Sequence, residues 1–380
     1  MKSPTHPAHV TLRHRERFAL SPERSEPRER RTLGTHRPVR VGVIGAGAWG
    51  PHVARTFAEE TTSALVVLAD LDEERLALAQ RRFPGVRITT DYSTLFDMTL
   101  DAVAIATPPD THHAIAKACL QQGLHCLVEK PLAMSVADAR DLIDTAHAHG
   151  RKLMAGHTFE YDPAVLEVRR MVQERELGEV FYLDAVRTEI GRYQLGSDAL
   201  WDLAPNDVSI ANFVFDGTPE RVTALAGSFS GRDRTVNDLV YLHLEYPGNR
   251  LANIRVSTLD PKETRTTTVV GDEKMVVYDD VSHLEKVRVY DRGARTGAPR
   301  DPRERSPASD RYGAISIPYL PPEEPLRVAT RHFAECVAGN IEPRTDGLCG
   351  LRVVEVLEAA ERSLASGGPV EIGVRASARS

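Results

Sequence analysis

The sequence predicts a doubly wound parallel α/β domain, followed by an α+β domain with a mostly antiparallel sheet and helical cover. Two observations predict this order. From residue 38, short apolar segments alternate with segments of helical spacing, which is typical of a parallel sheet covered on both faces. After about residue 160, short segments rich in β-branched and aromatic residues follow one another through turns, which is typical of antiparallel pairing.

Composition restricts the class of protein. The 380 residues, 41% of them hydrophobic and 27% charged, are enough for two domains with a core each. A net charge of −6 argues against nucleic acid or an anionic membrane surface as the main partner, and no apolar run approaches the roughly 20 residues that a membrane span needs. The four cysteines form no CxxC pair, so we expect reduced thiols, no metal site and a cytoplasmic location.

The first residues differ in composition from the rest of the chain. They carry proline, arginine, glutamate, serine and histidine without periodicity, which indicates a disordered basic arm, with an interaction tail as the alternative. Residues 293–311 are rich in proline, arginine and serine, which predicts a mobile loop there. The predicted organisation is an arm at 1–37, an α/β domain at 38–160, an α+β domain at 161–374 with the loop at 293–311, and a tail at 375–380.

In the first domain, strands and helices alternate regularly. The predicted strands are 39–44, 64–69, 102–106, 125–128 and 152–155. The predicted helices are 52–60, 73–83, 113–122 and 136–149. The last two are closed by Gly123 and Gly150, because glycine readily adopts the left-handed backbone that ends a helix.

In the second domain, strands dominate. They are expected at 180–188, 221–228, 239–246, 251–259, 266–270, 275–278 and 286–290. The residues Tyr-Pro-Gly-Asn-Arg at 246–250 predict a turn between two of them. Helices are expected at 164–176, 203–215, 328–338 and 348–365, where helical spacing of apolar residues returns.

A glycine-rich turn, Gly45-Ala46-Gly47-Ala48-Trp49-Gly50, lies between the first predicted strand and helix. In that context the first glycine permits the tight turn, the second lets the backbone approach a pyrophosphate, and the third lets the helix pack close to the strand. Asp70 ends the next strand, where a carboxylate accepts hydrogen bonds from ribose hydroxyls and repels a 2′-phosphate. We therefore expect NAD rather than NADP. The alternatives are a turn with no ligand and an Asp70 that only caps a helix.

Two further loops follow strands of the same sheet. Thr107-Pro108-Pro109 comes after the strand at 102–106, and Glu129-Lys130-Pro131 comes after the strand at 125–128. Loops at the carboxyl ends of parallel strands line the ligand crevice, and a lysine there can bind a substrate hydroxyl. The alternative is an exposed lysine beside a turn proline.

Residues 201–207, Trp-Asp-Leu-Ala-Pro-Asn-Asp, open a helix of the second domain. Asp202 and Asn206 lie four positions apart and share a face if the helix is regular, although Pro205 disfavours helix at Ala204. Asp202 as a simple N-cap is the alternative.

These motifs together resemble the glucose–fructose oxidoreductase / inositol dehydrogenase (Gfo/Idh/MocA) family, over about residues 39–374. The resemblance implies a Rossmann domain, an open-faced sheet often used for dimer or tetramer contacts, and NAD(P)-dependent oxidation or reduction of a secondary alcohol on a sugar or cyclitol. It implies that Lys130 touches substrate and cofactor and that Asp202 belongs to the same site. The corresponding Lys–Pro bond is often cis in the family, which implies a cis bond between Lys130 and Pro131. The implied cofactor-binding residues are Gly45, Ala46, Gly47, Ala48, Trp49, Gly50, Asp70, Thr107, Pro108, His112, Glu129 and Lys130.

One residue departs from the family pattern. Asn206 stands where dehydrogenases of the family have a histidine as general base, and an amide can orient a hydroxyl or polarise a carbonyl but does not titrate in this range. We therefore expect proton transfer to fall to Lys130, helped by Asp202 or water. The weaker substitutes are His112, His157 and His243. The predicted catalytic residues are Lys130, Asp202 and Asn206, and the predicted substrate contacts add Tyr161, Arg187 and Arg192, with salt bridging or packing as their alternative roles.

The favoured function is an NAD-dependent dehydrogenase or reductase that moves a hydride between nicotinamide and a secondary alcohol or ketone. The substrate class is a sugar, sugar nucleotide, aminosugar or aminocyclitol, and the Ala/Arg-rich composition favours a biosynthetic role such as antibiotic biosynthesis. A homodimer or homotetramer through the second sheet is expected. Two alternatives are an epimerase or lyase that keeps NAD bound without net redox change, and a non-catalytic NAD-binding regulator, which the loss of the histidine favours.

Overall fold

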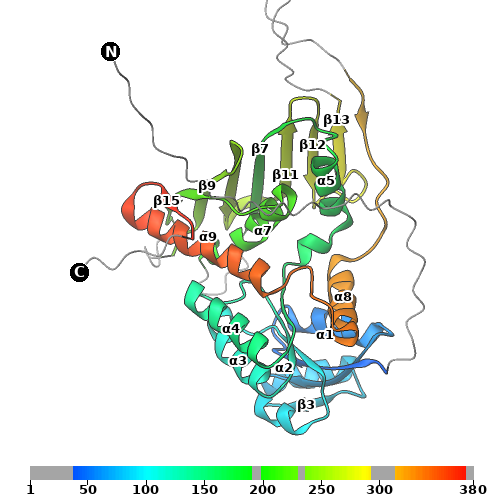
Figure 1. The fold of residues 1–380 in the computed structure, drawn as a ribbon. Helices are drawn as coiled ribbons and strands as arrows, with labels where there is room; N and C mark the ends of the chain where they lie inside the picture. Colours follow the sequence, from blue (N-terminus) through cyan, green and yellow to red (C-terminus); the bar gives the residue numbers. More distant parts are fainter. Residues whose placement is uncertain (1–36, 191–197, 230–235, 292–312, 374–380) are drawn as a thin grey trace, which may run out of the picture. The chain divides into compact units, whose positions relative to one another are not determined.

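The computed structural model describes residues 37–190, 198–229, 236–291 and 313–373. In these ranges the chain forms two sheets, one of six strands and one of nine, with helices packed between and around them (Figure 1). The described residues leave out Arg192 and nearly all of the predicted arm, mobile loop and tail.

The first sheet is parallel throughout, with the strand order β3-β2-β1-β4-β5-β6. The order reverses at β1, and in such sheets ligands bind outside the carboxyl ends of the strands at this reversal. The predicted Rossmann arrangement is therefore confirmed, although β3 was not predicted because its three partly exposed residues carry no apolar pattern. The strands are β1 (Val39–Ile44), β2 (Ser63–Ala69), β3 (Arg87–Thr89), β4 (Ala102–Ile105), β5 (His125–Val128) and β6 (Leu153–Ala155).

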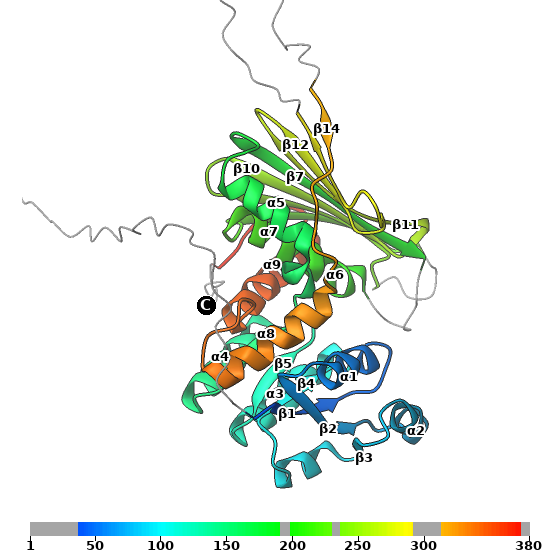
Figure 2. The same ribbon diagram turned by 90° about the vertical axis from the view of Figure 1, so that its right-hand side faces the viewer.

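Helices cover both faces of this sheet. In chain order they are α1 (Gly50–Glu59), α2 (Glu73–Arg82), the 3-10 turns η1 (Tyr92–Asp97) and η2 (Pro109–Thr111), α3 (His112–Gln121) and α4 (Val136–Ala148). A later helix, α8 (Pro325–Gly339), also packs here, against α1 (Figure 2). The rings of Phe57 in α1 and Phe333 in α8 lie 6.4 Å apart in one apolar cluster. By packing, α8 therefore contributes to the core of the first domain, although it lies in the range predicted for the second.

The second sheet has the order β14-β13-β12-β11-β7-β10-β9-β8-β15. Its strands pair antiparallel except for β7 and β10, which are parallel. β11 is longer than the strand predicted at 266–270, because its pairing with β7 continues through a register shift after Leu259. The strands are β7 (Val180–Ile190), β8 (Arg221–Gly227), β9 (Leu239–Tyr246), β10 (Arg250–Ser257), β11 (Leu259–Gly271), β12 (Met275–Asp279), β13 (Val287–Tyr290), β14 (Ile315–Ser316) and β15 (Val370–Glu371).

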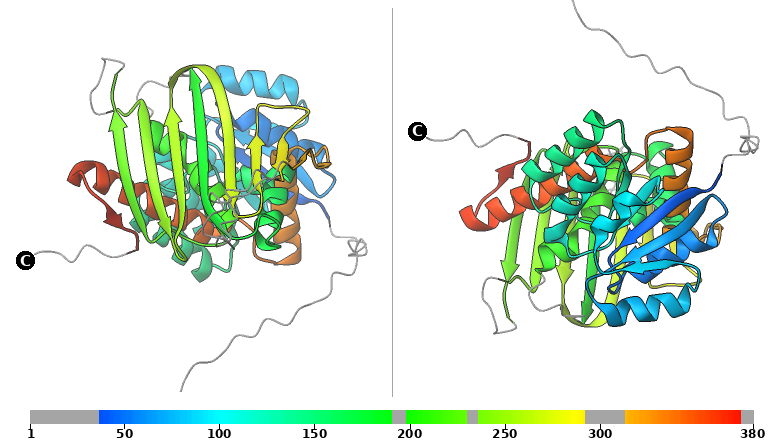
Figure 3. Two further views of the ribbon diagram at one scale, coloured as in Figure 1. Left: turned by 90° about the horizontal axis from the view of Figure 1, so that it is seen from above. Right: turned by 90° about the horizontal axis from the view of Figure 1, so that it is seen from below.

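One face of the second sheet is covered by helices and the other is bare (Figure 3, left). In β7, Leu183 and Ala185 are buried, whereas the intervening Tyr182 and Asp184 are exposed. This alternation confirms the predicted open face, because successive side chains of a strand point to opposite sides. The 3-10 turn η3 (Thr158–Tyr161) leads from the first sheet to the covering helices, which are α5 (Pro163–Gln173), α6 (Ala199–Asp202), α7 (Ala204–Phe215) and α9 (Gly347–Ser366).

The predicted helix at 203–215 corresponds to α7, which is preceded by the extra turn α6. Leu203 separates the two helices, and Pro205 occupies the start of α7, where its missing N–H costs no helical hydrogen bond. Asp198 caps α6 by accepting a hydrogen bond from the Leu200 N–H at 2.8 Å. Asp202 is therefore not the N-cap, and it ends α6 instead.

Candidate cofactor and active site

The glycine turn after β1 adopts a conformation that requires glycine. Gly45 has φ +103°, and a Cβ there would lie 2.5 Å from the carbonyl oxygen of Ala106. A Cβ at Gly50 would lie 1.9 Å from the carbonyl oxygen of Gly45. The turn is thus packed against both the loop after β4 and the start of α1, whose free N–H groups are suited to binding phosphate.

The same turn has the room and the charge that a dinucleotide needs. A Cβ at Gly47 would meet nothing closer than Arg75 Nη1 at 3.7 Å, so the backbone there is open to a phosphate. Asp70, the residue after β2, accepts hydrogen bonds from the Ala46 N–H at 2.5 Å and the Asp72 N–H at 2.8 Å. Because a carboxylate has further lone pairs for ribose hydroxyls and repels a 2′-phosphate, these residues fit NAD.

His112 connects two loops of the crevice. Its Nδ1 lies 2.8 Å from the carbonyl oxygen of Pro131, and its Nε2 lies 2.9 Å from that of Thr107. The side chain is buried, and this burial lowers its pKa. Since both ring nitrogens contact backbone carbonyls, His112 holds the loops after β4 and β5 together and is poorly placed to act as a base.

Lys130 and Asp202 meet between the two sheets. Lys130 follows β5, and its Nζ donates to the backbone oxygen of Asp202 at 2.6 Å and to Oδ1 at 3.2 Å. The Lys130–Pro131 peptide bond is cis, as the resemblance implied. The exposed fractions of the Lys130 and Asp202 side chains are 25% and 47%, so a ligand can reach the pair.

Asn206 lies in the first turn of α7. Its Nδ2 makes a long contact of 3.4 Å with the carbonyl oxygen of Leu203. From Ala199 to Ala211, every residue is buried except Asp202 and Asn206. These two side chains are therefore the part of the α6–α7 segment that is open to a ligand, and the structure brings Lys130 to one of them.

Two buried contacts hold the α6–α7 segment in place. The Arg187 guanidinium donates to Asp207 through Nε at 2.7 Å and Nη2 at 3.1 Å, and both side chains are almost fully buried. The Ser209 hydroxyl donates to Glu160 Oε1 at 2.6 Å, and the Cys349 thiol donates to the same oxygen at 3.2 Å. Burial raises the pKa of Glu160 to about 7. No local sequence signal points to either contact, because the partners lie far apart in the chain.

Two predicted substrate contacts are occupied by other interactions. Arg187 is bound by Asp207 and lies over the ring of Phe159, with its Cζ 4.6 Å from the ring centroid. Tyr161 is 1% exposed, and its hydroxyl lies 3.3 Å from Thr345 Oγ1. These contacts correspond to the salt-bridging and packing alternatives, whereas contact of Arg187 or Tyr161 with substrate stays a prediction, as it does for Arg192.

The other two histidines considered as substitutes for the missing base differ in position. His243 lies on the bare face of the second sheet, where its Nδ1 is 2.7 Å from Asn253 Oδ1, and so it is remote from the crevice. His157 follows β6 and is 2% exposed, and its ring nitrogens have no hydrogen-bond partner among the described residues. Burial, with a smaller contribution from the Lys130 charge, lowers the pKa of His157 to about 4. His157 is therefore a neutral imidazole near the candidate site.

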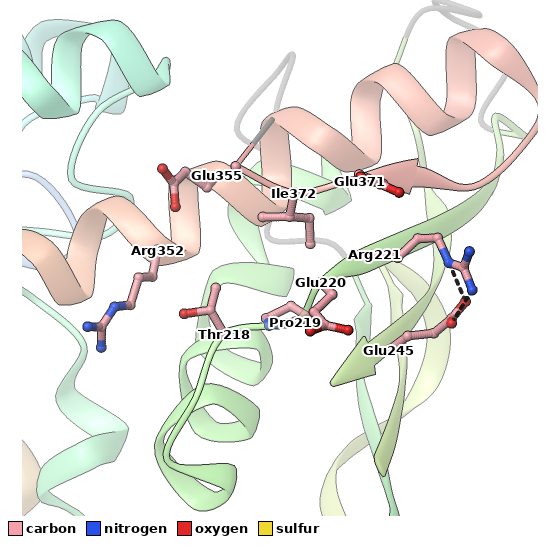
Figure 4. Close-up of a pocket in the computed structure, with 10 residues that line it drawn as sticks. Thr218, Pro219, Glu220, Arg221, Glu245, Arg352, Glu355, Glu371 and Ile372 are labelled. Carbon is pink, nitrogen blue, oxygen red and sulfur yellow. Dashed lines mark hydrogen bonds and ion pairs between the residues drawn. The ribbon is translucent and has the colours of Figure 1, made fainter. Parts of the chain in front are cut away.

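A separate hollow of about 650 Å³ lies beside α9, β8 and β15 (Figure 4). Its lining mixes charges of both signs, among them Glu220, Glu355 and the ion pair of Arg221 with Glu245, and it includes none of the predicted site residues. Over the described ranges, no helix has the length and apolar character needed to cross a membrane, and no three His, Cys, Asp or Glu side chains gather as a metal site would require.

Comparison with known protein families decides what kind of protein this is. The family model for Gfo/Idh/MocA oxidoreductases, described as having an NAD-binding Rossmann fold, matches residues 39–157. The model for the C-terminal domain of the same family matches residues 165–277. The chain belongs to the Gfo/Idh/MocA family. As a member, it is an oxidoreductase whose first domain is an NAD-binding Rossmann fold.

Several proteins and solved structures are similar to this Gfo/Idh/MocA protein. The UDP-N-acetylglucosamine 3-dehydrogenase of Acidithiobacillus ferrooxidans is 27% identical over 322 residues, which cover 83% of this chain and 94% of that protein. The uncharacterized oxidoreductase ORF334 of Rhizobium meliloti is 31% identical over 58% of this chain and 68% of its own length. The crystal structure of GenD2 from gentamicin A biosynthesis, in complex with NAD, superimposes with a TM-score of 0.75 at 26% identity and covers 90% of this chain and 99% of that chain.

Proposed function

We propose that this chain interconverts a secondary alcohol and a ketone, with NAD, on a sugar, sugar nucleotide, aminosugar or aminocyclitol. The contact between Lys130 and Asp202 carries the proposal, because it joins Lys130 to a carboxylate of α6, and an ammonium group can transfer a proton at the carboxyl end of β5. In a Rossmann domain with the adenosine side at Asp70, that is the half of the crevice left for nicotinamide. The names of the similar UDP-N-acetylglucosamine 3-dehydrogenase and of GenD2 from gentamicin A biosynthesis support this substrate class and a biosynthetic role.

The residues of the proposed site have separate roles in proton transfer and in orienting the substrate. Bound NAD supplies the hydride acceptor. Lys130 binds the reacting oxygen and takes its proton during oxidation or returns a proton during reduction. Asp202 holds the Lys130 side chain in place, and Asn206 fixes the substrate oxygen through a hydrogen bond without changing charge.

The role of Lys130 is tested by turnover of the purified protein with NAD and a panel of inositols, aminocyclitols and UDP-sugars, followed through NADH absorbance. Lys130→Met is expected to lower the rate by at least about 10²-fold, the usual scale for loss of an acid–base group. The matched control is Lys117→Met, which changes a lysine paired with Asp141 on the outside of α3 and should leave the rate unchanged. Equal rates for Lys130→Met and wild type would remove the lysine from the mechanism.

Two other outcomes would favour the alternative functions. Substrate conversion without net NADH, by protein that retains NAD through purification, would indicate an epimerase or lyase. An inactive wild type that gains activity on Asn206→His would indicate an NAD-binding regulator descended from an enzyme.

We also propose that the bare face of the second sheet joins two or four copies of the chain. Its exposed side chains include Tyr182, Leu225 and Tyr241, and large apolar groups gathered on one face are typical of an interface. Light scattering on wild type and on Tyr241→Glu tests this, and we expect the charged variant to shift toward the monomer. A monomeric wild type would contradict it.

A further inference from the structure

Trp49 and Glu129 link the glycine turn to the Lys130 loop. The Trp49 indole Nε1 donates to Glu129 Oε1 at 2.7 Å, although the two residues lie 80 positions apart. The other oxygen, Oε2, accepts a hydrogen bond from the backbone N–H of Lys130 at 3.3 Å. One carboxylate therefore connects the turn that is open to phosphate with the backbone of the residue that we expect to move the proton.

The two ends of this link differ in freedom. The Glu129 end is confined by Gly156 after β6, where a Cβ would lie 3.0 Å from Oε2 and 3.0 Å from the Glu129 Cα. The Trp49 end is 45% exposed, and its ring lies 5.5 Å from that of His52. A ligand in the crevice can thus contact the indole directly.

The requirements of the glycine turn leave Trp49 unexplained. That turn needs small residues where it bends, where the phosphate approaches and where α1 packs, and it places no demand on the position just before Gly50. A half-exposed indole there gains little from burial, yet its N–H is committed to a carboxylate from another loop. A hydrogen bond to a charged acceptor is about twice as strong as a neutral one, so this contact constrains both loops.

We propose that Trp49 and Glu129 are positioning residues that make the placement of Lys130 depend on occupancy of the glycine turn. A dinucleotide fixes the indole, the indole holds the Glu129 carboxylate, and the carboxylate holds the Lys130 backbone. The inference rests on the dinucleotide site of the proposed function and goes beyond it, because neither residue transfers a proton.

The charge of Glu129 gives the coupling a pH dependence. Desolvation raises the pKa of the Glu129 carboxyl to about 7, against the opposing effects of the Trp49 hydrogen bond and the Lys130 charge. The charge of Lys130 acts on Glu129 directly, and Lys130 is itself paired with Asp202 and close enough to His157 to lower its pKa. At the other end of the link, the His52 ring packs on that of Trp49. Protonation of Glu129 removes the negative charge that the Trp49 N–H contacts, so we expect the coupling to weaken as the pH falls below about 7.

ADP-ribose is the probe, because it fills the turn but has no nicotinamide to cover Lys130. The measurement is the rate at which an acylating reagent labels Lys130, read by peptide mass spectrometry, with ADP-ribose at a saturation established by calorimetry. In wild type we expect ADP-ribose to change this rate by at least about fivefold, the lower end of usual coupling between sites. In Trp49→Phe and in Glu129→Gln we expect ADP-ribose to bind and the change to fall below about twofold.

The matched control is Glu361→Gln. It weakens the other tryptophan–glutamate hydrogen bond of the described residues, from Trp201 Nε1 to Glu361 Oε1 at 2.7 Å, and should keep the wild-type response. The coupling is refuted if ADP-ribose binds wild type without changing Lys130 labelling, if the change persists in both Trp49→Phe and Glu129→Gln, or if Glu361→Gln abolishes it equally. Absence of any ADP-ribose binding by wild type would instead contradict the dinucleotide site and with it the proposed function.

Discussion

The two regions that meet at the candidate active site are positioned in different ways. The glycine turn and the Lys130 loop follow strand ends of the first sheet, and close contacts between backbones set their course. The segment from Asp202 to Asn206 spans the junction of α6 and α7. It is held by two buried contacts, the ion pair of Arg187 with Asp207 and the hydrogen bond that Ser209 donates to Glu160. The cofactor side is thus specified by backbone geometry, whereas the substrate side depends on buried charges that are costly to disturb.

Removing Arg187 should therefore have the largest effect on stability. Arg187→Leu leaves the Asp207 carboxylate buried without its partner, and we expect the free energy of unfolding to fall by about 3 to 5 kcal/mol. Urea unfolding measures this. The double variant Arg187→Leu/Asp207→Leu removes both charges and should recover part of the loss. A single variant as stable as wild type would show that the ion pair is not what holds α7.

The second anchor of this segment should respond to pH. Burial raises the pKa of Glu160 to about 7 from an ordinary 4.5, so the folded state binds this proton more tightly than the unfolded state. The resulting stability is fully present below pH 4.5 and is lost as the pH rises through about 7. Glu160→Gln removes the titration, so from pH 5 to pH 8 the wild type should lose about 2 kcal/mol relative to the variant. A difference that stays constant over this range would contradict the prediction.

The cofactor side can be tested by adding one methyl group. Gly47→Ala meets no atom within 3.7 Å, so we expect unchanged thermal unfolding, but its methyl group occupies the space assigned to phosphate. NAD affinity should fall at least about tenfold, or about 1.4 kcal/mol, by calorimetry. Gly50→Ala is the contrasting variant, because its methyl group overlaps the Gly45 carbonyl and should disrupt folding of the turn as well. Full NAD affinity in Gly47→Ala would place the phosphates elsewhere.

The smallest effect is expected at Asp70. Asp70→Asn keeps the size of the side chain but removes its charge and one of the two backbone hydrogen bonds that it accepts. Repulsion of a 2′-phosphate is then lost, and the ratio of NADP to NAD affinity should rise. We expect a change worth less than about 1 kcal/mol, because the partly exposed site is screened by water and salt. Dissociation constants of both nucleotides at low and high salt measure it. An unchanged ratio would assign cofactor choice to another residue.

The sequence was most informative where structure is local. The glycine turn, the Asp70 strand end and the alternation of β1, β2, β4, β5 and β6 with helices followed from spacing. β3 was missed because its three partly exposed residues carry no pattern. Helix α8 has an ordinary amphipathic sequence, and nothing in it reveals that its buried face packs on the first sheet rather than the second.

In the candidate site too, the sequence predicted some of the residues, and the fold decided which of them are in contact. The resemblance to the family named Lys130 and Asp202, but the 2.6 Å contact between residues 72 positions apart appears only in the folded chain. Arg187 was expected to meet substrate because it lies near the crevice, and the structure pairs it with Asp207. The roles of Glu160 and Trp49 also depend on partners that no spacing rule connects to them.

The sequence by itself determined most of the elements, the glycine turn and the presence of Asn206 in place of a histidine. Helix and strand periodicity, glycine conformation and side-chain chemistry are properties of neighbouring residues. Tertiary structure alone decided which charges are paired, which histidine nitrogens lack partners and which carboxylate joins two loops. The physical reason is desolvation: a buried charge must find a partner, and which groups are buried together is settled only when distant segments pack.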